Sequence, residues 1–92
     1  MAYGLLKKGE SMIETVLKER EKTHGNFCHH AQTAQRLKAV MHASRNWSSL
    51  SNADREALEM IQHKVARILS GDPNHADHWV DIAGYATLRI ER

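Results

Sequence analysis

The sequence lacks the features on which disulfide-bonded, exported and membrane-spanning proteins depend. Its 92 residues include one cysteine, Cys28, so no internal disulfide can form, and this is typical of a reducing compartment. No apolar run approaches the length of a membrane span. The N-terminus has neither the apolar core nor the cleavage site of a signal peptide. We therefore expect a cytoplasmic protein without a membrane partner.

A strong charge of one sign is also missing. The chain has 13 Lys and Arg residues against 11 Asp and Glu residues, which gives a formal net charge of +2. Basic residues gather near the start, but glutamates are interspersed among them. A nucleic-acid interface usually shows a clustered basic face. We therefore do not expect a nucleic acid as a partner.

Histidine, in contrast, is abundant, with seven residues. Histidines make the charge sensitive to pH near about 6.5 and raise the question of metal binding. Zinc sites usually take three or four ligands at spacings such as C-x-x-C or H-x-x-x-H. Neither residues 28–30 nor the set of His75, His78 and Asp81 fits such a spacing. No zinc site is expected.

Proline and glycine are scarce, and no stretch alternates apolar and polar residues as a strand would. The proline and the glycines lie mostly at the boundaries of four amphipathic segments, which we expect to be helices at residues 11–25, 26–44, 51–71 and 74–90. The short connections between these segments predict an all-α, four-helix bundle. We expect one helical domain over residues 11–92, after a flexible lead-in at residues 1–10.

Each helix begins with a residue that can cap it. The expected caps are Ser11 with Glu14, Asn26, Ser51 with Asp54, and Asn74 with Asp77. The first helix carries one apolar stripe, and Trp47, in the loop before the third helix, is expected to pack over the core. In the last helix the expected buried face is Trp79, Ala83, Ala86 and Ile90.

The last helix also has a second face with little charge, which includes Gly84 and Leu88. A glycine inside a helix costs about 1 kcal/mol against alanine. Close approach of another helix, from this chain or from a second copy, best explains Gly84. We therefore expect a homo-oligomer.

The third and fourth helices form a charged hairpin around a Gly-Asp-Pro turn. Such a short turn makes them antiparallel neighbours. Magnesium prefers oxygen ligands, and basic side chains neutralise phosphate oxygens. One interpretation is a cradle for Mg²⁺ and a di- or triphosphate, with Glu56, Glu59, Asp77 and Asp81 on the metal and Lys64 and Arg67 on the phosphates. The other is an interhelical ion network that only fixes helix packing.

The spacing of this hairpin resembles a known superfamily. Glu56-x-x-Glu59, followed by His78-x-x-Asp81, is similar to the acidic motifs of the MazG-type all-α nucleoside triphosphate pyrophosphohydrolases. The resemblance implies magnesium-dependent nucleotide binding and helical hairpins completed by a second subunit. Arg55 and His78 stand where that superfamily has glutamates, so turnover is left open.

Residues 19–90 also resemble a small domain of tailed phages and prophages, through the runs H-G-N-F, K-V-A-R and D-I-A-G-Y-A. The resemblance implies a bacterial host cell. It groups into one site the residues Lys64, Arg67, Asp81 and Tyr85, with His24 and Gly25 as walls and with His78 and Gly84 in supporting positions.

Three hypotheses follow for the function. The first is a nucleotide-binding protein with a MazG-like site, in which Lys64, Arg67 and His24 hold phosphate. The second is a non-enzymatic phage accessory protein that binds a host defence or replication protein. The third is a structural homo-oligomer without a small ligand, which is compatible with either of the others.

Overall fold

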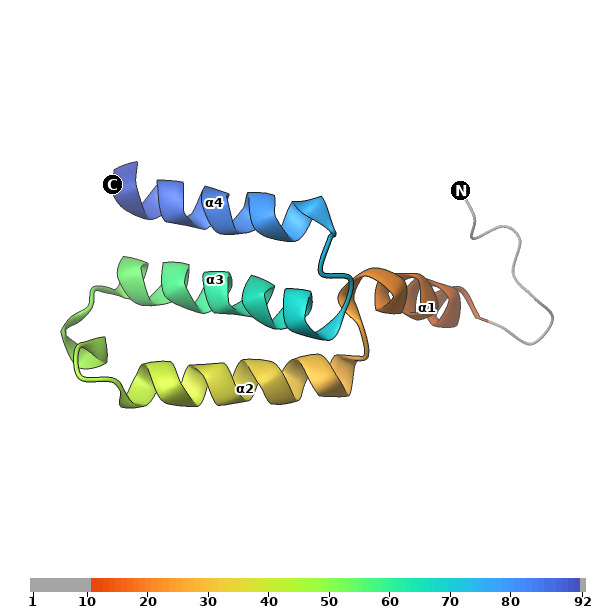
Figure 1. Ribbon diagram of the computed structural model, residues 1–92, viewed down its shortest axis with the longest axis horizontal. Helices are drawn as coiled ribbons and strands as arrows, with labels where there is room; N and C mark the ends of the chain where they lie inside the picture. Colours follow the sequence, from red (N-terminus) through yellow and green to blue (C-terminus); the bar gives the residue numbers. More distant parts are fainter. Residues whose placement is uncertain (1–10, 92) are drawn as a thin grey trace.

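The computed structural model describes residues 11–91 and consists of four α-helices (Figure 1). No strand occurs in that part of the chain. The helices are α1 (Met12–His24), α2 (Phe27–Ala43), α3 (Asn52–Ser70) and α4 (Ala76–Glu91), with a short 3-10 helix η2 (Trp47–Ser49) before α3. The prediction of an all-α, four-helix protein is therefore confirmed, whereas the predicted lead-in at residues 1–10 lies outside the described residues.

Three of the predicted caps are formed. The Ser11 Oγ accepts a hydrogen bond from the Glu14 N–H at 3.1 Å, and the Ser51 Oγ accepts one from the Asp54 N–H at 3.1 Å. The Asn26 Oδ1 accepts one from the Cys28 N–H at 2.9 Å. Each bond satisfies a backbone donor that the first turn leaves without a helical partner.

The fourth predicted cap is wrong, because α4 begins at Ala76 rather than directly after Asn74. The Asn74 N–H donates to the Asp72 Oδ1 at 2.9 Å and so belongs to the turn before the helix. The Trp79 Nε1–H donates to the Pro73 carbonyl at 3.2 Å and ties the helix back to that turn. An Asx turn made by the Asp72 side chain therefore occupies the segment in which the helix was expected to begin.

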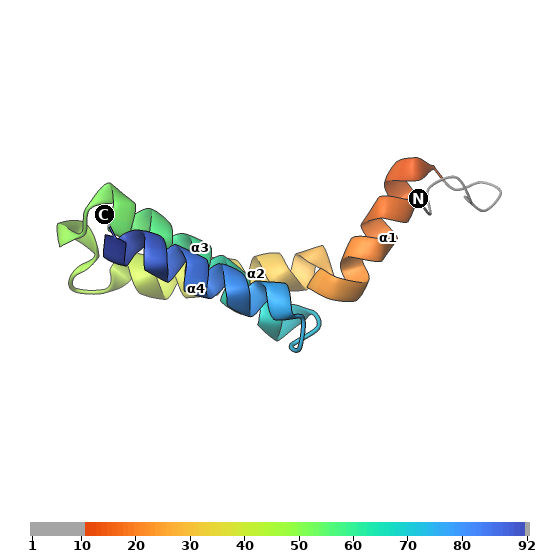
Figure 2. The ribbon, with the colours of Figure 1, turned by 90° about the horizontal axis from the view of Figure 1, so that it is seen from above.

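The helices α2, α3 and α4 lie side by side, with α3 in the middle (Figure 1). Seen from above, α1 projects away from this layer at the end where α2 begins (Figure 2). The described part of the chain measures 54 × 27 × 22 Å, and its radius of gyration of 16.4 Å exceeds the roughly 12 Å of a compact domain of this length. Among the described hydrophobic residues only Ala34 and Ala66 are fully buried, so one copy has a thin core.

The predicted buried face of α4 is wrong. Trp79 is 56% exposed, Ile90 is 77% exposed and Ala83 is also exposed. Because α4 has α3 on one side only, it turns a different set of residues inward, including the fully buried His78. A Cβ added at Gly84 would meet no atom of the described residues within 4 Å, so none of the helices within residues 11–91 approaches it.

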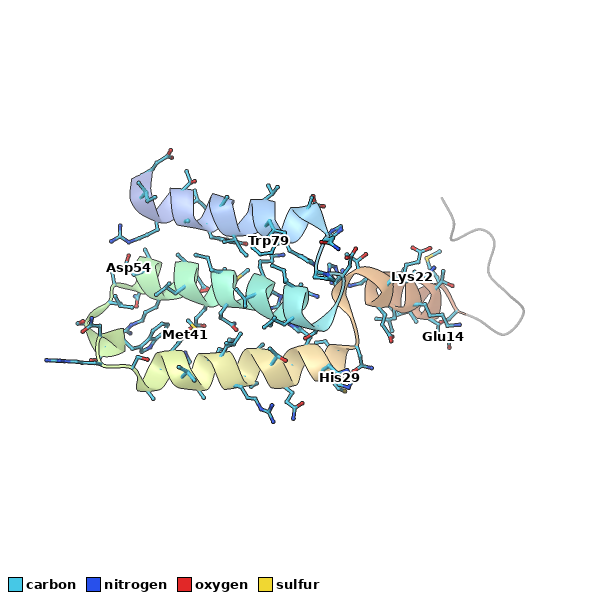
Figure 3. The ribbon with its side chains drawn as sticks, in the orientation of Figure 1. Glu14, Lys22, His29, Met41, Asp54 and Trp79 are labelled. Carbon is cyan, nitrogen blue, oxygen red and sulfur yellow. The ribbon has the colours of Figure 1, made fainter. Side chains whose placement is uncertain are left out.

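The apolar stripe predicted on α1 is also not buried against another described helix, because Met12, Ile13 and Leu17 are exposed and α1 buries no residue. Trp47 is half-buried and lies against the His42 ring, with a centroid distance of 4.8 Å. It lines an apolar cavity of about 350 Å³ together with Met41, which points from α2 toward α3 (Figure 3). No helix within residues 11–91 is long and apolar enough to span a membrane.

Candidate anion-binding site

Two turns pack backbone to backbone at the end of the helical layer. The Asp72 N–H, after α3, donates to the Thr23 carbonyl of α1 at 3.0 Å. A Cβ at Gly25 would collide with the Ser70 carbonyl, and a Cβ at Gly71 would lie 2.5 Å from the Thr23 oxygen. Glycine at both positions therefore permits the contact, which brings the end of α1 against the ends of α2, α3 and α4.

This contact gathers three histidines from distant parts of the chain. The ring of His24 lies 5.2 Å from that of His78, and His75 lies 4.8 Å from His78, between ring centroids. The His75 Nε2 is 3.6 Å from the Asp77 Oδ2. Within residues 11–91, however, no three side chains of His, Cys, Asp or Glu are grouped so that they could hold a metal ion.

Lys64 and Asp81 connect α3 to α4 next to these histidines. The Lys64 Nζ lies 2.9 Å from the Asp81 Oδ2, and the Lys64 side chain is 17% exposed. The pair therefore contributes to helix packing, as the second interpretation of the hairpin holds. It also borders a cavity of about 450 Å³, whose polar lining includes Glu19, Arg20, His24, Lys64, His75, Asp77, His78 and Asp81.

The remaining predicted metal ligands lie elsewhere. Glu56 is exposed, and the Glu59 Oε1 contacts the His42 Nε2 of α2 at 3.2 Å. The ion pair of Lys64 with Asp81 sets the antiparallel register, which places Glu59 about 7 Å along the helix axis from the level of Asp81. A single copy therefore does not bring the four carboxylates together, and the magnesium site stays a prediction.

Arg67 lies in a second cavity of about 450 Å³, at the junction of α1, α2 and α3. We call it the Arg67 cavity; its lining includes Leu17, Arg20, Glu21, His24, Gly25, Asn26, Phe27, Cys28, His30 and Arg67. The Arg67 Nε–H donates to the His63 Nε2 at 3.2 Å. Within residues 11–91, neither Arg67 nor Arg20 forms an ion pair with a carboxylate. The cavity therefore contains positive charge that no acidic side chain balances by direct contact.

The histidines around Arg67 show the effect of this charge. Burial, followed by the charge of Arg67, lowers the pKa of His24 to about 4 and that of His63 to about 4. The same two causes lower the pKa of His30. Burial, with a smaller effect of Arg20, lowers the pKa of Arg67 itself. At neutral pH the imidazoles are uncharged, because a protonated ring would be partly buried and would lie close to the positive charge of Arg67.

The structure thus divides the predicted site residues between two cavities that share Arg20 and His24 in their linings. Lys64, His78, Asp77 and Asp81 line the first, and Arg67 lines the second. Tyr85 is half-buried on α4, and Gly84 is exposed.

Sequence reasoning missed Arg20, Asn26 and His30 as lining residues of the Arg67 cavity. The spacing of Arg20 and His24, four residues apart on one helix, was an available signal. His30 gave none, because only the junction of three helices brings it beside Arg67.

The fold and this cavity define a small all-α protein with a cationic pocket at a helix junction. The chain belongs to the DUF6378 family, described as a domain of unknown function, whose sequence model matches residues 5–92. No curated protein and no solved structure matches it significantly.

Proposed function

We propose that the protein binds a phosphorylated small molecule, a nucleotide, with its phosphates in the Arg67 cavity. The observation that carries the proposal is the half-buried Arg67, next to the exposed Arg20, with neither side chain ion-paired to a carboxylate within residues 11–91. A partly desolvated charge is costly unless it is paired. A phosphate group supplies the missing charge, and guanidinium groups bind it with two parallel hydrogen bonds.

The start of α2 supports the same ligand. Asn26 caps this 17-residue helix and lines the cavity, so the positive end of the helix dipole lies beside Arg67. Helix N-termini of this kind favour phosphate groups. The resemblance to MazG-type proteins supports a nucleotide as the ligand, and the phage resemblance supports a location in the cytoplasm of a bacterial cell. Binding does not require turnover.

A titration of inorganic pyrophosphate and nucleoside mono-, di- and triphosphates, with and without Mg²⁺, tests the proposal by calorimetry. The test variant is Arg67→Gln. Its control is Arg36→Gln, because Arg36 is exposed on α2 and lies outside the cavity. We expect at least about a tenfold loss of affinity for Arg67→Gln, which corresponds to the loss of one charge-assisted hydrogen bond. Absence of binding to the wild type, or equal affinity of both variants, would contradict the proposal.

The comparison also separates lost binding from lost folding. Arg67→Gln removes a partly buried charge, so the unliganded variant should be as stable as the wild type or more stable. A variant that folds but does not bind supports a direct role of Arg67. Dependence of binding on Mg²⁺, lost in Asp81→Asn, would support the predicted metal role of the acidic residues.

We also propose that a second copy covers the exposed apolar surfaces. Helices α1 and α4 expose large apolar side chains, namely Met12, Ile13, Leu17, Trp79, Val80, Leu88 and Ile90. So many exposed apolar side chains on two helices favour an interaction surface. Light scattering should give the mass of a dimer or a larger oligomer. A monomer at micromolar concentration would contradict the proposal and direct attention to a host protein as the partner.

A further inference from the structure

The Arg67 cavity has two imidazoles in its lining, His24 at the end of α1 and His30 in the first turn of α2. His30 is only 4% exposed, and its Nδ1 has no hydrogen-bond partner within the described residues. The Nδ1 of His24 is likewise buried without a partner. A buried polar atom without a partner costs about 1–3 kcal/mol, so each ring has an unsatisfied nitrogen in the cavity that contains Arg67.

The groups that face these rings come from every adjoining element. Helix α3 contributes Arg67 and His63, and the His30 and His63 ring centroids are 4.7 Å apart. Helix α1 contributes Arg20 and Glu21, and the α3–α4 turn with α4 contributes His75 and His78. Glu21 is the one carboxylate in the described lining of the Arg67 cavity, and it is exposed. His24 also borders the first cavity, whose lining includes Glu19, Asp77 and Asp81, but the charges that act most on its ring are those of Arg67 and Arg20. The field at both rings is therefore dominated by positive charge.

A bound anion would change that field. The charge of Arg67 lowers the pKa of both rings, after the larger effect of burial, while a hydrogen bond with the Ala66 backbone raises that of His30. An anion beside Arg67 cancels part of this repulsion and attracts a proton itself, so each pKa rises on binding. A group whose pKa rises on binding takes up a proton, and binding then tightens as the pH falls.

We propose that the Arg67 cavity binds its anion together with a proton, and that His24 and His30 accept this proton. The inference rests on the proposed function and adds how the site is regulated. It assigns His30 as a further binding residue and makes the protein a phosphate binder whose affinity depends on pH.

Sulfate is the probe for the test, because it stays fully ionised over the pH range of the titration. A phosphate group has a second pKa of about 6, so it would take up a proton itself, and this proton could not be told from one taken up by an imidazole. Nuclear magnetic resonance follows the imidazole signals of the wild type during pH titrations with and without sulfate, at constant ionic strength. We expect sulfate to raise the pKa of His24 and that of His30 by about one unit. Such a rise means that sulfate binds the protein with the ring protonated about tenfold more tightly than with the ring neutral. His29 is the matched control, because it is exposed and lies outside the cavity.

Each outcome decides between the two proposals. Sulfate binding that raises neither pKa overturns the proton coupling and leaves the proposed function standing. Absence of both sulfate and pyrophosphate binding at every pH overturns both. His24→Gln should bind sulfate with a weaker dependence on pH than the wild type. The measurement on the wild type does not depend on whether His30→Gln, at a buried position, folds.

Discussion

The Lys64 Nζ lies 2.9 Å from the Asp81 Oδ2, and this ion pair joins α3 to α4 close to the turn that links them. The hairpin was predicted as a polar site, and the pair shows that part of its charge is used for packing. Its neighbour Arg67 has no such carboxylate within residues 11–91, and this difference between two basic residues one turn apart carries the proposed function.

Replacing Lys64 by Met should lower stability modestly. Asp81 is 43% exposed, so solvent screens the pair and its coupling energy should be about 0.5–1 kcal/mol. A double-mutant cycle with Asp81→Asn, measured by urea unfolding, gives this energy. A coupling near zero would mean that the contact does not stabilise the hairpin.

Gly25→Ala should be strongly destabilising. Gly25 has φ 79° and ψ −175°, a region that is nearly restricted to glycine, and a Cβ would collide with the Ser70 carbonyl. We expect a loss of about 2 kcal/mol or more in the free energy of unfolding. A smaller loss would show that the two turns separate easily.

Gly84→Ala distinguishes a monomer from an oligomer. A Cβ at Gly84 meets no atom within 4 Å in the part of the chain that the structure describes, so alanine should stabilise a monomeric helix by about 1 kcal/mol. If a second copy packs closely on Gly84, the same change should weaken association. Thermal unfolding at several protein concentrations separates the two results.

Val80→Glu should dissociate the proposed oligomer without unfolding the chain. Val80 is 64% exposed on the outer face of α4. Val40→Glu on α2 is the matched control, because Val40 is 68% exposed on another helix. Light scattering should report a lower mass for Val80→Glu alone, whereas equal masses for both variants would place the interface elsewhere.

Stability should fall as the pH decreases from about 7 toward 4. The folded state holds the pKa of His24 and of His63 at about 4, below the ordinary value of 6.5, so the unfolded chain binds more protons in this range. Stability is therefore fully present above about 6.5 and is lost as the pH falls. Urea unfolding across this range measures the loss. His63→Gln should flatten the profile, whereas His29→Gln should leave it unchanged.

The helices and most of their limits follow from local sequence. Ser11, Asn26 and Ser51 cap their helices through backbone donors two or three residues away. Such bonds need no tertiary contact, and the sequence therefore predicts them well. The cap predicted at Asn74 is wrong, because the Asp72 side chain forms a turn with the Asn74 N–H and α4 begins only at Ala76.

The sequence by itself determined an all-α chain of four helices with a charged hairpin between α3 and α4. Only the tertiary structure decided which charges meet. A helical wheel shows the faces of one helix, but it does not show which face a neighbour will cover, so Trp79 and Ile90 were placed inside and lie outside. The Arg67 cavity depends on two glycines, 46 positions apart, that let two turns touch. Contacts between residues so distant along the chain are set by the packing of whole helices, which no local pattern encodes.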